Sequence, residues 1–267
     1  MSKMNELIKS SIQLEIEGNQ LNISSISREG SLPPIVFLHG FGSTKEDYAD
    51  IVRHASLNNY PFLAYDAPGC GETVCSDLAC VSIPFLLKTA LVVLDELNID
   101  RFHLVGHSMG GLTALLLAHH CPERVLSFVD IEGNIAPEDC FLSRQIVDYP
   151  ASNAAEFFER FIKRTFNAPE YSSPLYSASL RHKVRAEAVP GIFSSMVDLS
   201  DKGDLMAKFL NLPCPKMFMY GEQNKSLSYL SDIECKGVRL SKIPECGHFP
   251  MYSNPPKMWQ EIIDFLG

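Results

Sequence analysis

The chain has 267 residues, which is long enough for one large α/β domain with an insertion, and 46% of them are hydrophobic, as is usual for a sizeable core. It has 23 basic and 32 acidic residues, so its formal net charge is −9 and nothing favours nucleic acid as a partner. The first residues lack the apolar core of a signal peptide, and the longest apolar helical stretch is interrupted by Lys88. We therefore expect no membrane partner.

The eight cysteines form no C-x-x-C pair, which is the spacing that many zinc sites use. Because no export signal is evident, we expect these cysteines to be free thiols in a reducing cytoplasm. We expect no metal and no cofactor. The sequence does not indicate an oligomeric state.

The predicted strands and helices alternate along the chain. Two alternating segments at residues 12–17 and 20–24 flank Gly18 and Asn19, a pattern that predicts a β-hairpin. Short apolar runs typical of buried strands follow at residues 34–38, 62–64, 102–105, 125–129, 217–220 and 237–240. Helical patterns separate most of them, at residues 45–55, 83–97, 112–119 and 256–265. This order predicts an α/β fold with a mainly parallel eight-stranded sheet and helices on both faces.

The alternation stops once, between residues 134 and 212, where helical stretches occur at 153–166 and 175–184 but no strand is predicted. We therefore expect a core made of residues 1–134 and 213–267. Residues 135–212 are predicted to form a helical cap, inserted after the sixth strand over the carboxyl edge of the sheet, where ligands bind in such folds. The aromatic and methionine residues of this segment are more typical of core than of a pocket. The cap sequence therefore does not identify a substrate.

The motif Gly106-His107-Ser108-Met109-Gly110 joins a predicted strand to a predicted helix. In a G-x-S-x-G turn the serine adopts a strained backbone conformation, and the glycines leave room for the crossing strand and helix. Such a turn exposes the serine hydroxyl at the carboxyl end of the sheet. Ser108 is thus the candidate nucleophile.

A nucleophilic serine needs a base, and His248 is the best placed of the eight histidines. It follows the last predicted strand and precedes the final helix, so its loop reaches the same sheet edge as Ser108. The backbone amides of Phe41, after the third predicted strand, and of Met109, at the start of the helix, are the candidate oxyanion donors.

These motifs resemble the α/β-hydrolase superfamily, in its capped, single-domain branch. The resemblance rests on the Ser108 motif, on His39-Gly40-Phe41-Gly42, on Asp66-Ala67-Pro68-Gly69-Cys70-Gly71 and on Gly247-His248. It covers the chain except for the cap. It implies a serine hydrolase with a catalytic triad, but such motifs are weakly specific for a substrate.

The acid of the triad departs from the usual family pattern. The family usually places an aspartate in a G-x-x-D turn after the cap, but here that turn ends in Asn224. Some members instead carry the acid after the strand that follows the nucleophile helix, and Glu132 stands at the position that resembles theirs. We therefore assign Glu132 as the acid. Asp130 and Glu222 are alternatives, and Asn224 itself could orient the histidine.

The resemblance implies cleavage of a small-molecule ester, thioester or lactone through an acyl-enzyme on Ser108. Carbon–carbon bond hydrolysis of a diketone uses the same triad in similar members and is an alternative, as is the chemistry of haloperoxidase-like relatives. Haloalkane dehalogenases and epoxide hydrolases use an aspartate where this chain has Ser108, which argues against them. A ligand-binding homologue without turnover is a third alternative, supported by Asn224.

Overall fold

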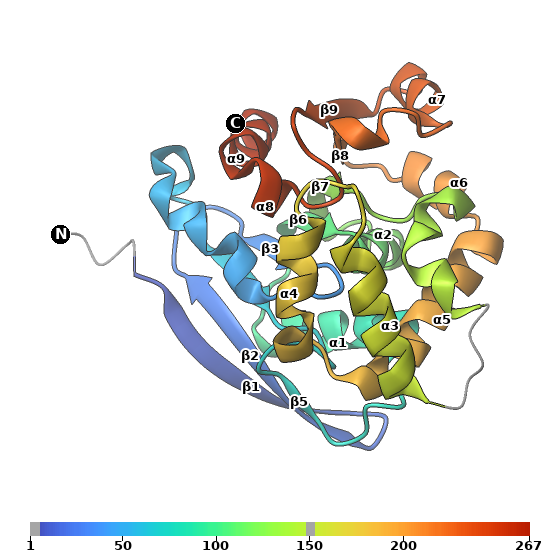
Figure 1. Ribbon diagram of the computed structural model, residues 1–267. Coiled ribbons are helices and arrows are strands. Elements are labelled where there is room, and N and C mark those ends of the chain that lie inside the picture. Colours follow the sequence, from blue (N-terminus) through green and yellow to red (C-terminus); the bar gives the residue numbers. More distant parts are fainter. Residues whose placement is uncertain (1–5, 148–152) are drawn as a thin grey trace.

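The computed structural model describes residues 6–147 and 153–267, and its centre is a single sheet with helices on both faces (Figure 1). The strands lie in the order β1-β2-β4-β3-β6-β7-β8-β9, and the short β5 pairs with β2. The β1–β2, β2–β4 and β2–β5 pairs are antiparallel, and all other pairs are parallel. The strands are β1 (Ile8–Ile16), β2 (Asn19–Arg28), β3 (Ile35–Leu38), β4 (Phe62–Tyr65), β5 (Val74–Cys75), β6 (Phe102–His107), β7 (Val125–Ile131), β8 (Lys216–Gly221) and β9 (Arg239–Ile243). The predicted, mainly parallel α/β sheet is confirmed.

The helices follow the strands as the sequence pattern requires. The α-helices are α1 (Ile83–Glu96), α2 (Met109–His120), α3 (Ala154–Phe166), α4 (Ser173–Lys183), α5 (Val189–Lys202), α6 (Leu205–Leu210), α7 (Leu230–Cys235), α8 (Pro250–Ser253) and α9 (Pro255–Leu266). The 3₁₀ helices are η2 (Lys45–Arg53), η3 (Ala55–Leu57), η4 (Pro137–Phe141), η5 (Ser143–Ile146), η6 (Ala186–Ala188) and η7 (Glu222–Asn224). None of the helices in the described ranges is long and apolar enough to cross a membrane.

Strand β3 shows how the two faces of the sheet are covered. Phe37 packs against Tyr48 of η2 and Trp259 of α9, with ring centroids 4.5 and 5.9 Å apart. The next side chain, Leu38, lies beside Leu86 of α1 and Thr113 of α2. Successive residues of a strand point to opposite faces, so η2 and α9 cover one face and α1 and α2 the other. All four residues of β3 are buried, which explains their continuous apolar run.

Several predicted boundaries are wrong for local reasons. Strand β1 begins earlier than predicted. Its first four side chains are exposed and show no alternation, so the sequence pattern did not reveal them. The hairpin turn is Glu17-Gly18 rather than Gly18-Asn19, and both residues have positive φ, as a two-residue hairpin loop requires. Strand β9 starts after Gly237, whose φ of +85° belongs to a turn. The two-residue β5 was missed, and it makes the sheet nine-stranded rather than eight-stranded.

The described residues between β7 and β8 form helices and no strand. Helices α3 and α4 pack side by side, and α5 contacts α3 and η5 (Figure 1). The last helix of the segment, α6, contacts α2, and its Phe209 packs against Phe128 of β7. This segment therefore reaches from the end of β7 back to a face of the sheet.

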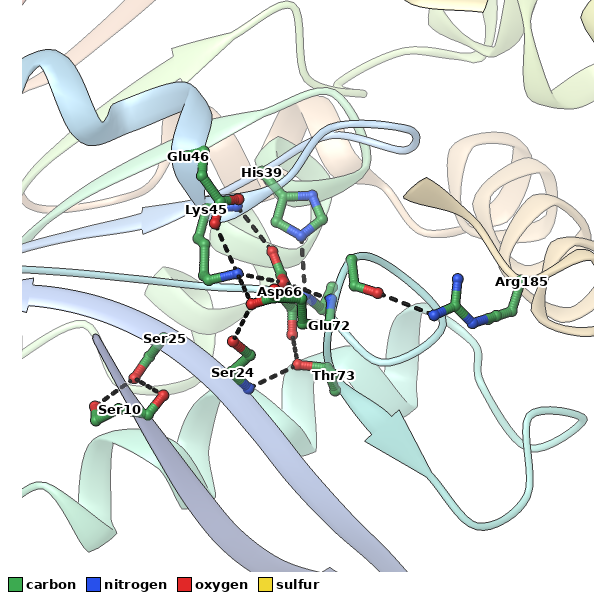
Figure 2. A network of polar contacts seen from close by, with 12 residues as sticks. Ser10, Ser24, Ser25, His39, Lys45, Glu46, Asp66, Glu72, Thr73 and Arg185 are labelled. Carbon is green, nitrogen blue, oxygen red and sulfur yellow. Dashed lines mark hydrogen bonds and ion pairs between the residues drawn. The ribbon is translucent and has the colours of Figure 1, made fainter. Parts of the chain in front are cut away.

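A buried ion cluster joins the loop after β3 to the loop after β4 (Figure 2). Lys45 and Asp66 are 1% and 0% exposed, and the Lys45 ammonium lies 2.8 Å from the Asp66 carboxylate. Lys45 also contacts Glu46 and Glu72, which are partly in solvent. Burial alone would lower the pKa of Lys45, but the hydrogen bonds to these three carboxylates outweigh burial and raise it. Lys45 therefore keeps its positive charge.

Backbone contacts extend this cluster to the loop that carries Phe41. The Asp66 carboxylate accepts hydrogen bonds from the Lys45 and Glu72 amides. His39 Nε2 accepts from the Ala67 amide at 2.9 Å (Figure 2). This leaves Nδ1 to donate to the Gly40 carbonyl at 2.8 Å. The two loops at the carboxyl ends of β3 and β4 are thus fixed to each other.

The cluster generates a stability prediction. Replacing Lys45 by methionine leaves the Asp66 carboxylate buried without its cation, so we expect Lys45→Met to lower the free energy of unfolding by about 3–5 kcal/mol. The matched control is Lys88→Met, which removes a half-exposed ion pair with Glu17 and should cost about 1 kcal/mol or less. Urea unfolding measures both values. Equal losses in the two variants would mean that the cluster is effectively solvated.

Candidate active site

The turn at Ser108 has the strained geometry that the G-x-S-x-G motif predicts. Ser108 has φ 52° and ψ −117° and stands between β6 and α2. A Cβ atom at Gly106 would lie 2.6 Å from the Gly110 carbonyl oxygen, and one at Gly110 would lie 2.1 Å from the Leu38 carbonyl oxygen. Neither position accepts a larger residue without a backbone shift. The glycines thus let β3, β6 and α2 approach closely enough to hold the turn.

His248 lies between Ser108 and Glu132. Its Nε2 is 2.9 Å from Ser108 Oγ, and its Nδ1 is 3.4 Å from Glu132 Oε2. The second contact is the longer of the two. All three side chains are buried or nearly so: Ser108 is 8% exposed, Glu132 6% and His248 6%. The structure therefore brings the three predicted residues together in one hydrogen-bonded chain.

Glu132 is held by donors from the end of β8 and from η7. Its Oε1 accepts from the Gly221 amide at 2.6 Å, and its Oε2 accepts from Asn224 Nδ2 at 2.8 Å. The backbone at Glu132 has φ 51°, which turns the chain away from the end of β7. Asn224 is therefore a hydrogen-bond donor to the Glu132 carboxylate. The sequence analysis identified the position of Asn224 and missed this role.

The alternative acids are placed differently. Asp130 is fully buried, and burial, with smaller effects from Asp139 and Glu132, raises its pKa well above the usual value against the opposing Gly133 amide. A raised pKa favours the neutral carboxyl, which stabilises an imidazolium less well than a carboxylate does. The Asp130 carboxyl group instead packs against Gly111 and Gly133, so closely that a Cβ atom on either glycine would collide with it. Glu222 accepts from the Glu245 amide at the surface, at 3.3 Å.

The two predicted oxyanion donors come from separate loops. Phe41 follows β3 and Met109 is the first residue of α2. Neither amide donates to another group within the part of the chain that the structure describes. The Phe41 carbonyl accepts from the Tyr176 hydroxyl of α4 at 2.9 Å. Two unpaired amides at the carboxyl edge of a sheet can stabilise a developing negative charge.

His107 contacts the loop that carries His248. It is fully buried, and burial, aided by the proximity of His248, lowers its pKa well below the usual value, so the ring is neutral. Its Nε2 lies 2.8 Å from the His248 carbonyl oxygen and donates to it, while the other side of the ring closes on Gly40. His107 thus ties the His248 loop to the loop of Phe41. This role of His107 was not predicted from the sequence.

Two cavities adjoin this site. The inner one, of about 10 Å³, is lined by Ser108, Phe41, Phe193 and Met196 among others. The outer one, of about 360 Å³, lies between η4 and η5 on one side and α3 on the other. Leu142, His248 and Phe249 line both cavities. The arrangement can hold a small molecule beside Ser108, with donors for an oxyanion and a base for a proton.

Comparison with known proteins finds the same fold along almost the whole chain. Residues 35–260 match the profile of the alpha/beta hydrolase family. The chain is 26% identical over 261 residues to the pimeloyl-[acyl-carrier protein] methyl ester esterase of Aeromonas hydrophila, which covers 91% of this chain and 99% of the relative. It is 26% identical over 245 residues to the 2-succinyl-6-hydroxy-2,4-cyclohexadiene-1-carboxylate synthase of an Enterobacter species, covering 88% of this chain and 92% of that one.

Among solved structures, one from a study of carboxylesterases of Nitrososphaera gargenis superposes with a TM-score of 0.76. It covers 96% of this chain and 97% of its own, at 14% sequence identity. At this identity the likeness is one of fold alone. The relatives differ in the reactions that their names describe, so the comparison does not identify a substrate.

A buried carboxyl near Glu132 generates a prediction about pH. Asp139 accepts hydrogen bonds from Tyr229 and from the Ile135 and Ala136 amides, but burial outweighs them and raises its pKa from 3.8 to about 7. Between these two values the folded chain holds a proton that the unfolded chain has released, so the stability contributed by this group is lost as pH rises towards 7.

Asp139→Asn removes this titration. The free energy of unfolding of the variant, minus that of the wild type, should therefore rise between pH 4 and pH 7, by at most about 1.4 kcal/mol per pH unit, and then stay constant. Urea unfolding of both proteins across this range measures the difference. A difference that is independent of pH would show that Asp139 titrates alike in the folded and unfolded chains.

Proposed function

The chain belongs to the alpha/beta hydrolase family, and on that premise we propose that it cleaves a small carboxylic ester, thioester or lactone through an acyl-enzyme intermediate. It is an enzyme of the serine hydrolase class within this fold, and its relatives include proteins named as esterases. The observation that carries the proposal is the hydrogen-bonded chain from Ser108 through His248 to Glu132. These three groups have the order and the contacts that hydrolysis by serine needs.

The proposed reaction has two halves. In the first, Ser108 Oγ attacks the carbonyl carbon while His248 Nε2 takes the serine proton and then gives it to the leaving atom. The amides of Phe41 and Met109 stabilise the oxyanion, and Glu132 holds His248 in the tautomer whose Nε2 is free. In the second half, water attacks the acyl-serine, with His248 again as base. The products are an acid and an alcohol, or a thiol in the case of a thioester.

The contacts of Asn224 support an active hydrolase over the alternative of a homologue that binds a ligand without turnover. That alternative depended on an amide in the usual place of the acid. Asn224 and the Gly221 amide both donate to Glu132, so the carboxylate has partners for its charge and a fixed direction. No feature of the site specifically favours carbon–carbon bond cleavage.

We further propose that residues 135–212 form the cap that selects the substrate. Within its described part, Phe193 and Met196 of α5 line the inner cavity together with Ser108 and His248. We also propose the cytoplasm as the site of action, which the eight free cysteines support.

Loss of the nucleophile tests the proposal. Ser108→Ala should lower kcat for any hydrolysed ester by on the order of 10⁴ or more, because the attacking group is gone while the fold remains. The matched control is Ser241→Ala, at a buried serine of β9 away from the cavities, which should keep near wild-type activity. A fluorophosphonate should label the wild type at Ser108, as peptide mass spectrometry would detect. Near wild-type turnover by folded Ser108→Ala would refute the proposal.

A further inference from the structure

The inner cavity beside Ser108 is closed by a cluster of phenylalanines. Phe41 contacts Phe193, with ring centroids 4.6 Å apart, and also Phe158 and Phe161 at 6.4 and 6.0 Å. Phe161 and Phe193 also contact each other, at 5.4 Å. All these rings are at most 5% exposed. The side of Phe41 that faces α3 and α5 is therefore filled by these three rings.

The volume of the inner cavity sets a limit on what enters it. At about 10 Å³ it has room for roughly one water-sized group, since a single water needs about 10–15 Å³ by this measure. Phe193 and Met196, both of α5, form part of its wall. A methyl group fits such a space, and each added methylene has to displace a side chain.

The outer cavity is much larger, and it adjoins His248 rather than Ser108. Its volume of about 360 Å³ falls in the range of sites that bind small molecules. It is lined by His248 and Phe249 but not by Ser108 or Phe41. It also offers polar groups, Gln145, Arg164 and Glu170, along its wall. A bulky part of a substrate can therefore occupy this cavity, on the side of the site where His248 lies.

The mechanism at Ser108 determines which cavity receives the acyl group of an ester and which receives its alcohol. In the tetrahedral intermediate the oxyanion faces the amides of Phe41 and Met109. The leaving oxygen has to lie beside His248, since that ring gives it a proton. The remaining substituent, the acyl group, then faces the wall of Phe193 and Met196.

We propose that the preferred substrates are esters of a very short acid, of acetyl size, with a large alcohol that occupies the outer cavity. This inference rests on the proposed function and adds the division of the substrate between the two cavities. Attack by Ser108 forms the acetyl-serine bond and breaks the bond from the acyl carbon to the alcohol oxygen, which leaves with the proton from His248. Water then releases acetate and restores Ser108. Met196 and Phe193 are the residues that set the length of the acid.

A pair of isomeric esters tests this division. Hexyl acetate and methyl heptanoate contain the same atoms, but the long chain is on the alcohol in the first and on the acid in the second. We expect kcat/KM for hexyl acetate to be higher by at least about tenfold, because even one misplaced methylene costs that much in a closed pocket. Equal values, or a preference for methyl heptanoate, would overturn the division.

A variant connects the preference to the inner wall. Met196→Ala should raise kcat/KM for hexyl butyrate relative to hexyl acetate by about tenfold, while the control Met206→Ala, in α6, should leave the ratio unchanged. An unchanged ratio in Met196→Ala would remove Met196 from the acyl pocket and overturn the assignment of that wall. If neither isomer is cleaved and a fluorophosphonate leaves Ser108 unlabelled, the proposed function itself fails. Labelling of Ser108 with a preference for methyl heptanoate would overturn the division alone.

Discussion

The carboxylate of Glu132 is the group on which the geometry of the site depends. It is almost fully buried, so its charge needs partners, and it finds them in the Gly221 amide, Asn224 and His248. These partners come from the end of β8, from η7 and from the loop after β9, whereas Glu132 directly follows β7. One side chain thus fixes three segments relative to one another. The direction of His248, and hence its approach to Ser108, follows from this arrangement.

The other side of the site is fixed by a second set of contacts. The buried pair of Lys45 and Asp66 joins the loops after β3 and β4, and His39 adds a bond to the Ala67 amide. Tyr176 of α4 then donates to the Phe41 carbonyl and stacks on Phe249, next to His248. The helical segment between β7 and β8 therefore contacts both the loop of the proposed oxyanion donor and the loop of the proposed base. A change in that segment can alter substrate fit and chemistry together.

The sequence predicted the parts of this structure that depend on local patterns. Gly106, Ser108 and Gly110 identify a strained turn because only glycine leaves room for the crossing backbone, and the buried parallel strands appear as short apolar runs. The contacts of Asn224, His107 and Tyr176 were not predictable, since each joins residues far apart in the chain. Strand β5 escaped for another reason: its two residues are too few to form a pattern, and Val74 is 61% exposed. Glu132 was assigned from the resemblance to a subset of the family and not from its surroundings.

In the proposed mechanism Glu132, and not the side-chain amide of Asn224, is the group that orients His248. The most direct measurement is kcat of Glu132→Gln beside that of Asn224→Ala, on one ester that the wild type cleaves. Loss of the carboxylate should lower kcat by up to about 10⁴, as loss of a triad aspartate does. Loss of the Asn224 amide should cost far less, because the Gly221 amide still holds the carboxylate. If Glu132→Gln keeps most of its activity while Asn224→Ala has none, the amide is the third member of the triad and the account is wrong.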